Sequence, residues 1–377
     1  RTSRGLGDVY KRQMQTIFYI ILMTYAYQII RYKIGWSLIK PSQKKTYRPS
    51  VSVIVALRNE EKNINNLLDF LKNQNYNDKV LEFILVNDHS SDNTLSLLHK
   101  SNIENLRIIN LKDNEYGKKT AIIKAVNIAN GEIILATDAD CCFDINWVSS
   151  MVSYFQNPDV HLVSGPVIYH KKNSFFQKLQ CLEFVSLVAS AAGSVGINNA
   201  IFCNGANMAY RKKSFLKLND FNESRSPSGD DVFLLHSIKS KNNKSIVFAK
   251  EKNAIVATDG QPSLSSFINQ RKRWASKSTL YKDVASTYVS YLVFFTNLIF
   301  AFLSIMSFFS SNFLISFILF FIIKSIVDFL LLFPVLKFFK RIDLAKLIFP
   351  FELFYSFYIV VIACLSFYKS FEWKDRI

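Results

Sequence analysis

The chain has 377 residues, of which 50% are hydrophobic and 15% aromatic. This apolar content excludes an intrinsically disordered chain, and the composition also excludes a small disulfide-stabilised scaffold. Lys and Arg number 46 against 29 Asp and Glu, which gives a formal net charge of +17. That balance alone indicates a nucleic acid or a membrane surface as partner, and the length allows about two domains.

Residues 1–13 (RTSRGLGDVYKRQ) show no apolar period and precede Met14. We interpret them as a non-native leader, such as a translated adapter or read-through sequence, and leave them out of the fold prediction. Without the four basic residues and one acid of this segment, the net charge falls from +17 to +14. The basic excess therefore belongs to the rest of the chain.

Residues 14–36 form the next segment and contain an uncharged, aromatic-rich stretch from Thr16 to Ile30. Arg31 and Lys33 follow it directly. This pattern predicts an N-terminal transmembrane anchor. A cleaved signal peptide is the alternative, and the lack of a small-residue cleavage site counts against it.

Three apolar runs between residues 285 and 369 predict three more transmembrane helices, over Tyr288–Met306, Phe313–Leu336 and Leu347–Phe367. Basic residues flank these runs and the N-terminal anchor. By the positive-inside rule they place the intervening region in the cytoplasm and predict a multi-pass protein of the cell inner membrane. These basic residues are Lys40, Lys44, Lys45, Arg48, Arg271, Lys272, Arg273, Lys277, Lys282, Lys337, Lys340, Arg341 and Lys346.

Two charged residues, Lys324 and Asp328, lie inside the second C-terminal run at i and i+4, a spacing that puts them on one helical face. Charges at that depth are costly unless they are paired. We expect both side chains to face the bundle interior. They either neutralise each other only or also position a polar acceptor or a lipid head group.

The region between the anchor and these runs alternates strands and helices. Short β-branched runs predict strands, each followed by a segment with helical spacing, including one helix capped by Ser91 or Asp92 and one over Gly117–Asn130. This alternation predicts an α/β fold with a mostly parallel sheet and helices on both faces. The predicted strands are Val51–Leu57, Val80–Val86, Leu106–Leu111 and Glu132–Thr137.

Polar clusters fall at the carboxyl ends of these strands, where open α/β sheets bind ligands. Asp138 and Asp140 directly follow the fourth predicted strand, in the sequence ATDAD. Side chains alternate along an extended backbone, so the two carboxylates lie on one side. Hard oxygen ligands so placed suit Mg²⁺ or Mn²⁺ holding a diphosphate. Solvated loop carboxylates are the alternative.

Several ordered motifs together resemble a membrane-bound family 2 glycosyltransferase with the GT-A fold, over roughly residues 50–280. The resemblance implies a cytoplasmic GT-A domain over residues 48–280 that binds a nucleotide sugar with Mg²⁺ or Mn²⁺. The motifs are VSVIVALRNEEKNI, FILVNDHSSDNT, GKKTAIIKAV, ATDADC, CNGANMAYRKKSF, SGDDVFLL and NQRKRW.

The same resemblance implies a donor site. It places Asp88 at the base or ribose, Lys118 at the diphosphate and Asp138 with Asp140 at the metal. Asn87 and Ala56 depart from the family pattern, which commonly has Asp and Pro there, and this leaves the nucleotide open. An Asx turn is the alternative for Asp88, and a solvated lysine for Lys118. The implied donor-binding residues are Arg58, Asn59, Glu60, Asp88, Lys118, Asp138 and Asp140.

Catalytic and acceptor roles also follow from the resemblance. Asp231 corresponds to the general base, with Asp230 beside it, although both could instead cap a helix. In the Q-x-x-R-W motif, Arg273 would neutralise the leaving diphosphate, whereas a basic helix lying on anionic lipid is the alternative. The implied acceptor-binding residues are Gly205, Asn207, Gln270 and Trp274.

Two further features carry weaker expectations. The apolar segment Phe175–Val195 predicts an interfacial helix or, equally, a buried core helix. The cysteines lack metal-type spacing, so we expect small buried hydrophobic residues and neither zinc nor a disulfide.

The sequence thus predicts an inverting glycosyltransferase that passes a sugar from a nucleotide sugar, with a UDP-sugar favoured, to a glycan or glycolipid in cell-envelope or exopolysaccharide synthesis. Transfer to polyprenyl phosphate or another lipid is one alternative, and a catalytically silent, nucleotide-sugar-binding membrane scaffold is another. Because the basic residues track the membrane boundaries, we do not expect nucleic acid as a partner. Oligomeric state does not follow from the sequence.

Overall fold

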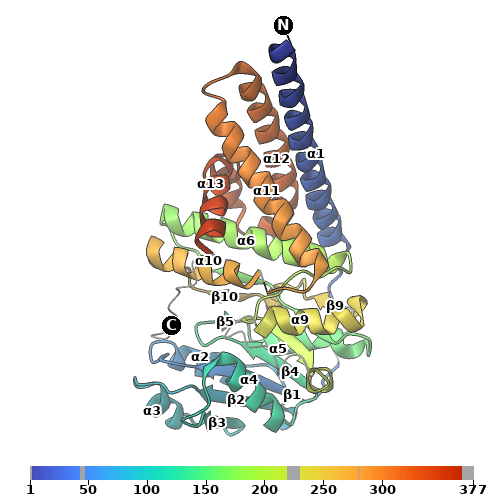
Figure 1. Ribbon diagram of the computed structural model, residues 1–377. Coiled ribbons are helices and arrows are strands. Elements are labelled where there is room, and N and C mark those ends of the chain that lie inside the picture. The colour runs from blue at the N-terminus through green and yellow to red at the C-terminus, as the bar shows by residue number, and fades with distance from the viewer. Residues whose placement is uncertain (1, 43–46, 219–229, 279, 367–377) are drawn as a thin grey trace. The chain divides into compact units, whose positions relative to one another are not determined.

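The computed structural model describes residues 2–42, 47–218, 230–278 and 280–366 (Figure 1). The chain divides into two compact units. Among the described residues, the sheet unit is formed by 35–42, 47–173, 191–218 and 230–260, and the helical unit by 2–34, 174–190, 261–278 and 280–366.

Four parallel strands carry the sheet unit, and each lies within one residue of its predicted position. β1 pairs with β2 on one side and with β4 on the other, and β3 extends the sheet beyond β2. All four end at the same edge because the pairs are parallel and in register, with Leu57 opposite Asn87 and Val55 opposite Thr137. Their bounds are Val51–Leu57 (β1), Leu81–Asn87 (β2), Leu106–Asn110 (β3) and Ile133–Thr137 (β4).

The sheet continues beyond β4 with three strands in the order β8, β6 and β9. β8 is antiparallel to both β4 and β6, whereas β9 is parallel to β6. A separate three-stranded sheet has the order β5, β10, β7. Their bounds are Cys142–Phe143 (β5), Leu162–Ser164 (β6), Val167–Tyr169 (β7), Met208–Arg211 (β8), Ile246–Phe248 (β9) and Val256–Thr258 (β10).

Helices connect these strands as the alternating pattern predicts. α4 packs its buried face of Ala121, Ala125 and Val126 against β1 and β2. The α-helices of this unit are α2 (Ile64–Lys72), α3 (Thr94–His99), α4 (Gly117–Ile128), α5 (Trp147–Val152), α7 (Lys212–Leu216) and α9 (Asp230–Lys241). Short 3₁₀ turns cover Asp78–Val80, Ser153–Gln156, Asn243–Ser245 and Lys252–Ala254. The mostly parallel α/β sheet is therefore confirmed.

The helical unit contains most of the long helices. Among the described helices, four are long and apolar enough to cross a membrane: Phe175–Gly196, Val284–Met306, Ser311–Phe338 and Ile342–Ser366. The last three confirm the predicted C-terminal spans. The helices are α1 (Thr2–Leu38), α6 (Phe175–Gly196), α10 (Leu264–Ser278), α11 (Val284–Met306), α12 (Ser311–Phe338) and α13 (Ile348–Ser366), with a 3₁₀ turn over Ile342–Leu347.

α1 covers the residues predicted as an N-terminal anchor, although it is not among the four described helices that are long and apolar enough to cross a membrane. It also continues through the segment interpreted as a leader. Leu22, which is fully buried, packs with Phe300 of α11 and Phe320 of α12 in one apolar cluster. The Tyr19 hydroxyl donates to Ser316 Oγ of α12 at 3.1 Å. α1 therefore belongs to the same bundle as the C-terminal helices (Figure 1).

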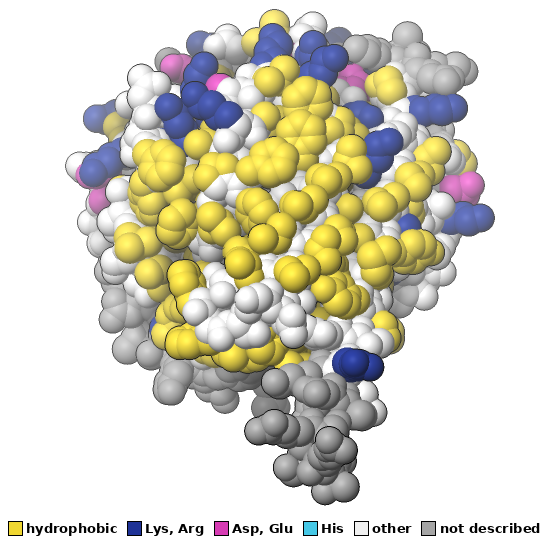
Figure 2. Space-filling model, turned by 90° about the horizontal axis from the view of Figure 1, so that it is seen from above, with side chains coloured by type: hydrophobic (Ala, Val, Ile, Leu, Met, Phe, Trp, Pro, Cys, Tyr) yellow, Lys and Arg dark blue, Asp and Glu magenta, His cyan; other side chains and the backbone are white. Residues whose placement is uncertain are grey.

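Exposed hydrophobic side chains are concentrated on the bundle helices α1, α11, α12 and α13, as expected for surfaces that face lipid. Figure 2 shows hydrophobic side chains gathered across the middle of one face, with Lys and Arg mainly towards its edge. By contrast, 72% of the most apolar stretch of α6 is buried. The structure therefore supports the buried-helix interpretation of this segment.

The charged pair in α12 lies in the bundle interior, as expected, but it has a third partner. Lys324, which is fully buried, donates to Asp328 Oδ2 at 2.9 Å and also forms an ion pair with Glu352 of α13. The Tyr25 hydroxyl of α1 donates to Asp328 Oδ1 at 2.7 Å. One cation thus joins two carboxylates, so simple mutual neutralisation of Lys324 and Asp328 is wrong as a full description.

The cysteine prediction holds in part. Cys141, Cys181 and Cys203 are buried, and burial raises the pKa of the Cys141 and Cys203 thiols. Cys142 is half-buried and Cys364 is exposed on α13, which corrects the expectation that all five are buried. A small thiol on a bundle surface of this kind is compatible with an apolar surrounding.

The ion cluster generates a stability prediction. We expect Lys324→Met to lower the free energy of unfolding by about 3–5 kcal/mol, because it leaves two buried carboxylates without their cation. Thermal and denaturant unfolding in detergent measure this loss. Lys337→Met, at an exposed position of the same helix, is the matched control and should leave the midpoint unchanged. An equal midpoint for both variants would contradict the role given to Lys324.

Candidate functional site

The loop that follows β1 is tied to the loop that follows β2. Arg58 Nη1 donates to the Asp88 carbonyl at 3.2 Å, and the Asn59 amide N–H donates to Ser90 Oγ at 3.0 Å. The Glu60 amide N–H donates to Thr94 Oγ1 at 2.7 Å. Asn59 has a φ of +51°, a left-handed conformation that Asn tolerates better than most residues. The parallel register thus brings Arg58, Asn59, Glu60 and Asp88 together.

Asp88 is buried and connects β2 to the start of α4. Its Oδ2 accepts from the Gly117 amide N–H at 3.0 Å, and its Oδ1 lies 3.0 Å from His89 Nδ1. The first contact places a carboxylate at a helix N-terminus, where the exposed N–H groups favour an anion. The Ser90 amide N–H donates to Asn87 Oδ1 at 3.1 Å, so the neighbour of Asp88 holds this loop.

Asp138 and Asp140 follow β4, as predicted, and their environments differ. Asp138 is partly exposed and forms an ion pair with Lys118 of α4. Asp140 is exposed, and its Oδ2 accepts from the Thr258 hydroxyl of β10 at 2.9 Å. Partial removal of the carboxylate from water and then the negative charge of Asp138 raise the pKa of Asp140. The pair is therefore an anionic site that a bound cation would stabilise.

The donor set at this position fits a divalent metal that is shared with a ligand. Asp138 and Asp140 supply hard carboxylate oxygens, which Mg²⁺ and Mn²⁺ prefer. Within the part of the chain that the structure describes, no cluster of three or more His, Cys, Asp or Glu side chains is arranged for a metal. Two protein carboxylates leave the remaining ligand positions to water or phosphate oxygens, which is typical of Mg²⁺ bound with a nucleotide.

Asp231 lies in the first turn of α9 and is held by backbone N–H groups. Its Oδ2 accepts from the Gly205 amide at 2.9 Å, and its Oδ1 accepts from the Val232 amide at 2.9 Å. The carboxylate is thus fixed against the loop that precedes β8. The alternative, in which Asp231 caps its own helix, holds in part, because the Val232 amide that donates to Oδ1 belongs to the first turn of α9. The side chain of Asp230 lies outside the described residues.

Asn207 does not line an open surface, and its predicted role in direct acceptor binding requires correction. The side chain is fully buried. Its Nδ2 donates to the Pro166 and Ala254 carbonyls at 2.9 and 2.7 Å, and its Oδ1 accepts from Trp147 Nε1 at 3.0 Å. These bonds use the amide to join β8 to its surroundings, so Asn207 supports the loop that carries Gly205.

The Q-x-x-R-W residues lie on α10 in the helical unit. Gln270, Arg273 and Trp274 are all half-buried. Arg271, in contrast, is buried and forms an ion pair with Glu183 of α6. The alternative of a basic helix lying on lipid is therefore wrong for Arg271, because its charge is directed into the protein.

Three partners of these site residues were not predicted from the sequence. Thr258 carries no distinctive pattern, since a Thr in a short strand is common. Glu183 and Glu352 had a usable signal, because each is the single acid in its apolar run. An isolated acid within such a run indicates a buried partner of opposite charge.

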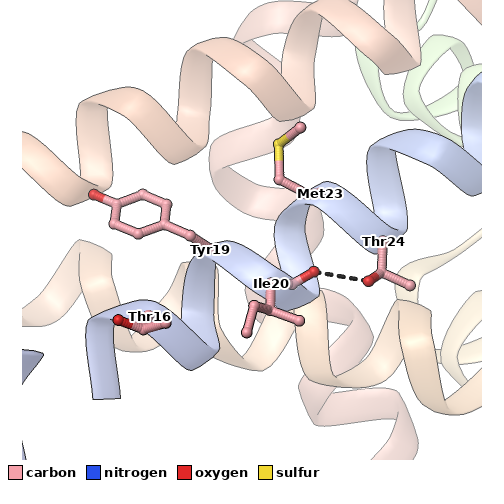
Figure 3. A pocket seen from close by; sticks show the side chains of 5 residues that line it. All are labelled: Thr16, Tyr19, Ile20, Met23 and Thr24. Atoms are coloured by element: carbon pink, nitrogen blue, oxygen red, sulfur yellow. Dashed lines mark hydrogen bonds between the residues drawn. The ribbon is translucent and has the colours of Figure 1, made fainter. Parts of the chain in front are cut away.

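A hollow of about 430 Å³ lies on α1 and shares no lining residue with the clusters described above (Figure 3). It is lined by five uncharged side chains, and none of the predicted site residues is among them. The lining residues are Thr16, Tyr19, Ile20, Met23 and Thr24.

The parallel sheet, the carboxylate pair after β4 and the carboxylate at the start of α9 are arranged as the resemblance to the GT-A fold implies. Residues 52–218 match the protein-family model described as Glycosyl transferase family 2. This match agrees with the resemblance to family 2 glycosyltransferases that the motifs carry.

Curated relatives agree with this assignment. The poly-beta-1,6-N-acetyl-D-glucosamine synthase of Staphylococcus epidermidis is 27% identical over 205 residues, which cover 54% of this chain and 48% of that protein. The synthase of the same name from Staphylococcus aureus (strain COL) is 28% identical over 197 residues, covering 50% and 46%. The chain thus spans about half the length of the curated relatives it matches.

A solved structure confirms the fold over nearly the whole chain. Mannosyltransferase PcManGT from Pyrobaculum calidifontis, solved in complex with GDP-Man and Mn²⁺, superimposes with a TM-score of 0.58. It is 16% identical, and the match covers 94% of this chain and 96% of that one. At this identity the likeness concerns the fold.

The corrected role of Asn207 generates a prediction. We expect Asn207→Ala to destabilise the protein by about 1–3 kcal/mol for each buried partner left unsatisfied. Unfolding followed by Trp fluorescence measures this loss, since Trp147 contacts the amide. Asn102→Ala, in an exposed loop, is the control. A stable Asn207→Ala variant that lost only acceptor binding would restore the direct role.

Proposed function

We propose that the protein is a membrane-bound inverting glycosyltransferase that transfers a sugar from a nucleotide sugar, with a UDP-sugar favoured, to a glycan or glycolipid acceptor. The observation that carries this proposal is the division of acidic residues into two sites. Asp138 and Asp140 form an anionic pair after β4, whereas Asp231 is held by backbone N–H groups at the start of α9. The pair of Asp138 and Asp140 suits metal binding, and the position of Asp231 suits a general base.

The donor would bind at the carboxyl edge of the sheet. Asp88 would meet the base or ribose, and the loop of Arg58, Asn59 and Glu60 would enclose the nucleotide. When bound, a divalent metal at Asp138 and Asp140 would neutralise charge on the diphosphate. Lys118 already pairs with Asp138 and would meet the phosphates from the N-terminus of α4.

Asp231 would act as the general base. Its carboxylate takes the proton of the acceptor hydroxyl as that oxygen attacks C1 of the sugar. The bond from C1 to the diphosphate breaks in the same step, and the nucleoside diphosphate leaves from the opposite side. This single displacement inverts the anomeric carbon and forms no covalent bond to the enzyme. The Gly205 amide keeps the base in place through Oδ2.

Three residues of α10 are proposed for the acceptor and the leaving group. Arg273 would neutralise the departing diphosphate, and Gln270 with Trp274 would border the acceptor, the indole giving a face on which a sugar ring can stack. The predicted orientation puts the sheet unit in the cytoplasm, where nucleotide sugars are made, and the chain in the cell inner membrane. Exopolysaccharide or cell-envelope synthesis is the process we favour, because the curated relatives are named as polysaccharide synthases.

The base assignment is tested by release of nucleoside diphosphate. We expect Asp231→Asn to lower turnover by about 10²–10⁴-fold, the usual contribution of a general base. UDP-N-acetylglucosamine is the first donor to assay, since the relatives are named for that sugar. The amide oxygen of Asn retains an acceptor for Gly205, so the loop should stay in place. Wild-type turnover in Asp231→Asn contradicts the assignment.

A donor screen with the wild-type protein separates the remaining alternatives. Product attached to polyprenyl phosphate would identify the lipid acceptor. No turnover with any nucleotide sugar, given a membrane extract as acceptor source, would support the silent scaffold instead.

The metal assignment is tested by Mn²⁺ titration monitored by electron paramagnetic resonance in the presence of UDP. Loss of a group that only hydrogen-bonds to a metal ligand lowers metal affinity about 10- to 100-fold. Asp140 is proposed as a direct ligand, so we expect Asp140→Asn to lower the affinity for Mn²⁺ by at least this factor. Asp144→Asn is the matched control, because Asp144 is an exposed carboxylate only four residues away. Equal Mn²⁺ affinity in the two variants would refute the site.

A further inference from the structure

The Q-x-x-R-W segment contains one cation whose charge is wholly directed into the helical unit. The side chains of Arg271 on α10 and Glu183 on α6 are 4% and 5% exposed. Arg271 Nε donates to Glu183 Oε1 at 2.9 Å, and Nη2 donates to Oε2. The pair is therefore forked, a geometry that fixes the plane of the guanidinium as well as its position.

That guanidinium contacts two of the residues proposed to border the acceptor. Arg271 Nη1 donates to Gln270 Oε1, and the guanidinium carbon lies 4.3 Å from the ring centroid of Trp274. The same carbon lies 4.5 Å from the ring centroid of Phe267. One buried group thus sets the rotamer of the amide and the tilt of the indole.

A third helix completes the anchor. The Tyr358 hydroxyl of α13 donates to Glu183 Oε1 at 3.4 Å, and the Tyr358 ring stacks on Phe267 with centroids 5.6 Å apart. Phe184, next to Glu183, lies 6.2 Å from the Trp274 ring. The face of α10 that carries Gln270 and Trp274 is therefore held by α6 and α13 together.

Stability alone is a weak reason for such a pair. Removing two charges from water is costly, and a buried ion pair replaced by apolar or neutral groups of similar volume is often equally stable or more stable. A forked pair does, however, restrict orientation in a way that apolar contacts do not.

We propose that Glu183 and Arg271 are positioning residues that set Gln270 and Trp274 for the acceptor, so that α6 and α13 determine acceptor specificity. This inference rests on the proposed glycosyltransferase function. It assigns Arg271 no contact with substrate: the residue acts through the two neighbours that its guanidinium touches.

The test compares three variants of the full-length protein in detergent or nanodiscs. Glu183→Gln leaves a buried Arg271 charge without its counter-charge. The double variant Glu183→Gln/Arg271→Met removes both charges at nearly constant volume, so it should fold even if the single variant does not. Tyr291→Phe, which removes an exposed hydroxyl from α11, is the control. The probes are UDP-N-acetylglucosamine and a β-1,6-linked N-acetylglucosamine oligomer.

We expect the double variant to retain the wild-type unfolding midpoint and donor KM, while its acceptor KM rises about 10- to 100-fold, as small misplacements of a binding group do. Hydrogen–deuterium exchange over residues 264–278 should rise in the double variant and not in the control. If the double variant had the acceptor KM and the exchange protection of the wild-type protein, the pair would be purely structural and the proposal would be overturned.

The two readouts separate this inference from the proposed function. Exchange over residues 264–278 does not depend on turnover, so unchanged exchange overturns the inference whatever the enzyme does. Absence of transfer by the wild-type protein with every donor and acceptor tested overturns the proposed function instead.

Discussion

The parallel register of β1 with β2 and β4 is the constraint on which the candidate site depends. It places Leu57 opposite Asn87 and Val55 opposite Thr137, so the loops after three strands leave the same edge of the sheet. Arg58 reaches the Asp88 carbonyl, and Asp88 in turn reaches the first amide of α4. A shift of one strand by one residue would turn its side chains to the other face and separate these groups.

A second constraint acts in the helical unit, where buried charges fix the helices. Lys324 joins α12 to α13 through Glu352, and Arg271 joins α10 to α6 through Glu183. In an apolar surrounding each cation has few alternative partners, so the pairing selects one arrangement of helices among several that apolar packing alone would allow. The bundle is thus more than a membrane anchor: it also sets the helix that carries the Q-x-x-R-W residues.

Much of the sheet unit could be predicted from the sequence because hydrophobic periodicity is a local property. All four parallel strands lie within one residue of their predictions, and the acidic residues after β2 and β4 lie where the strand order requires. The partners of those acids could not be predicted, because Thr258 is 118 residues from Asp140 and belongs to a short strand. Glu183 and Glu352 show the same limit, because a lone acid in an apolar run predicts that a partner of opposite charge exists but does not identify that partner. Asn207 lies in a recognisable motif, yet only packing distinguishes a side chain that faces a ligand from one that supports the loop.

We propose that separate carboxylates serve metal binding and base catalysis, so that transfer occurs by a single displacement. The anomeric configuration of the product tests it most directly. We expect NMR of the product formed from an α-linked UDP-sugar to show a β-linkage. An α-linked product would contradict the claim, because retention requires either a second displacement or attack from the side of the leaving group.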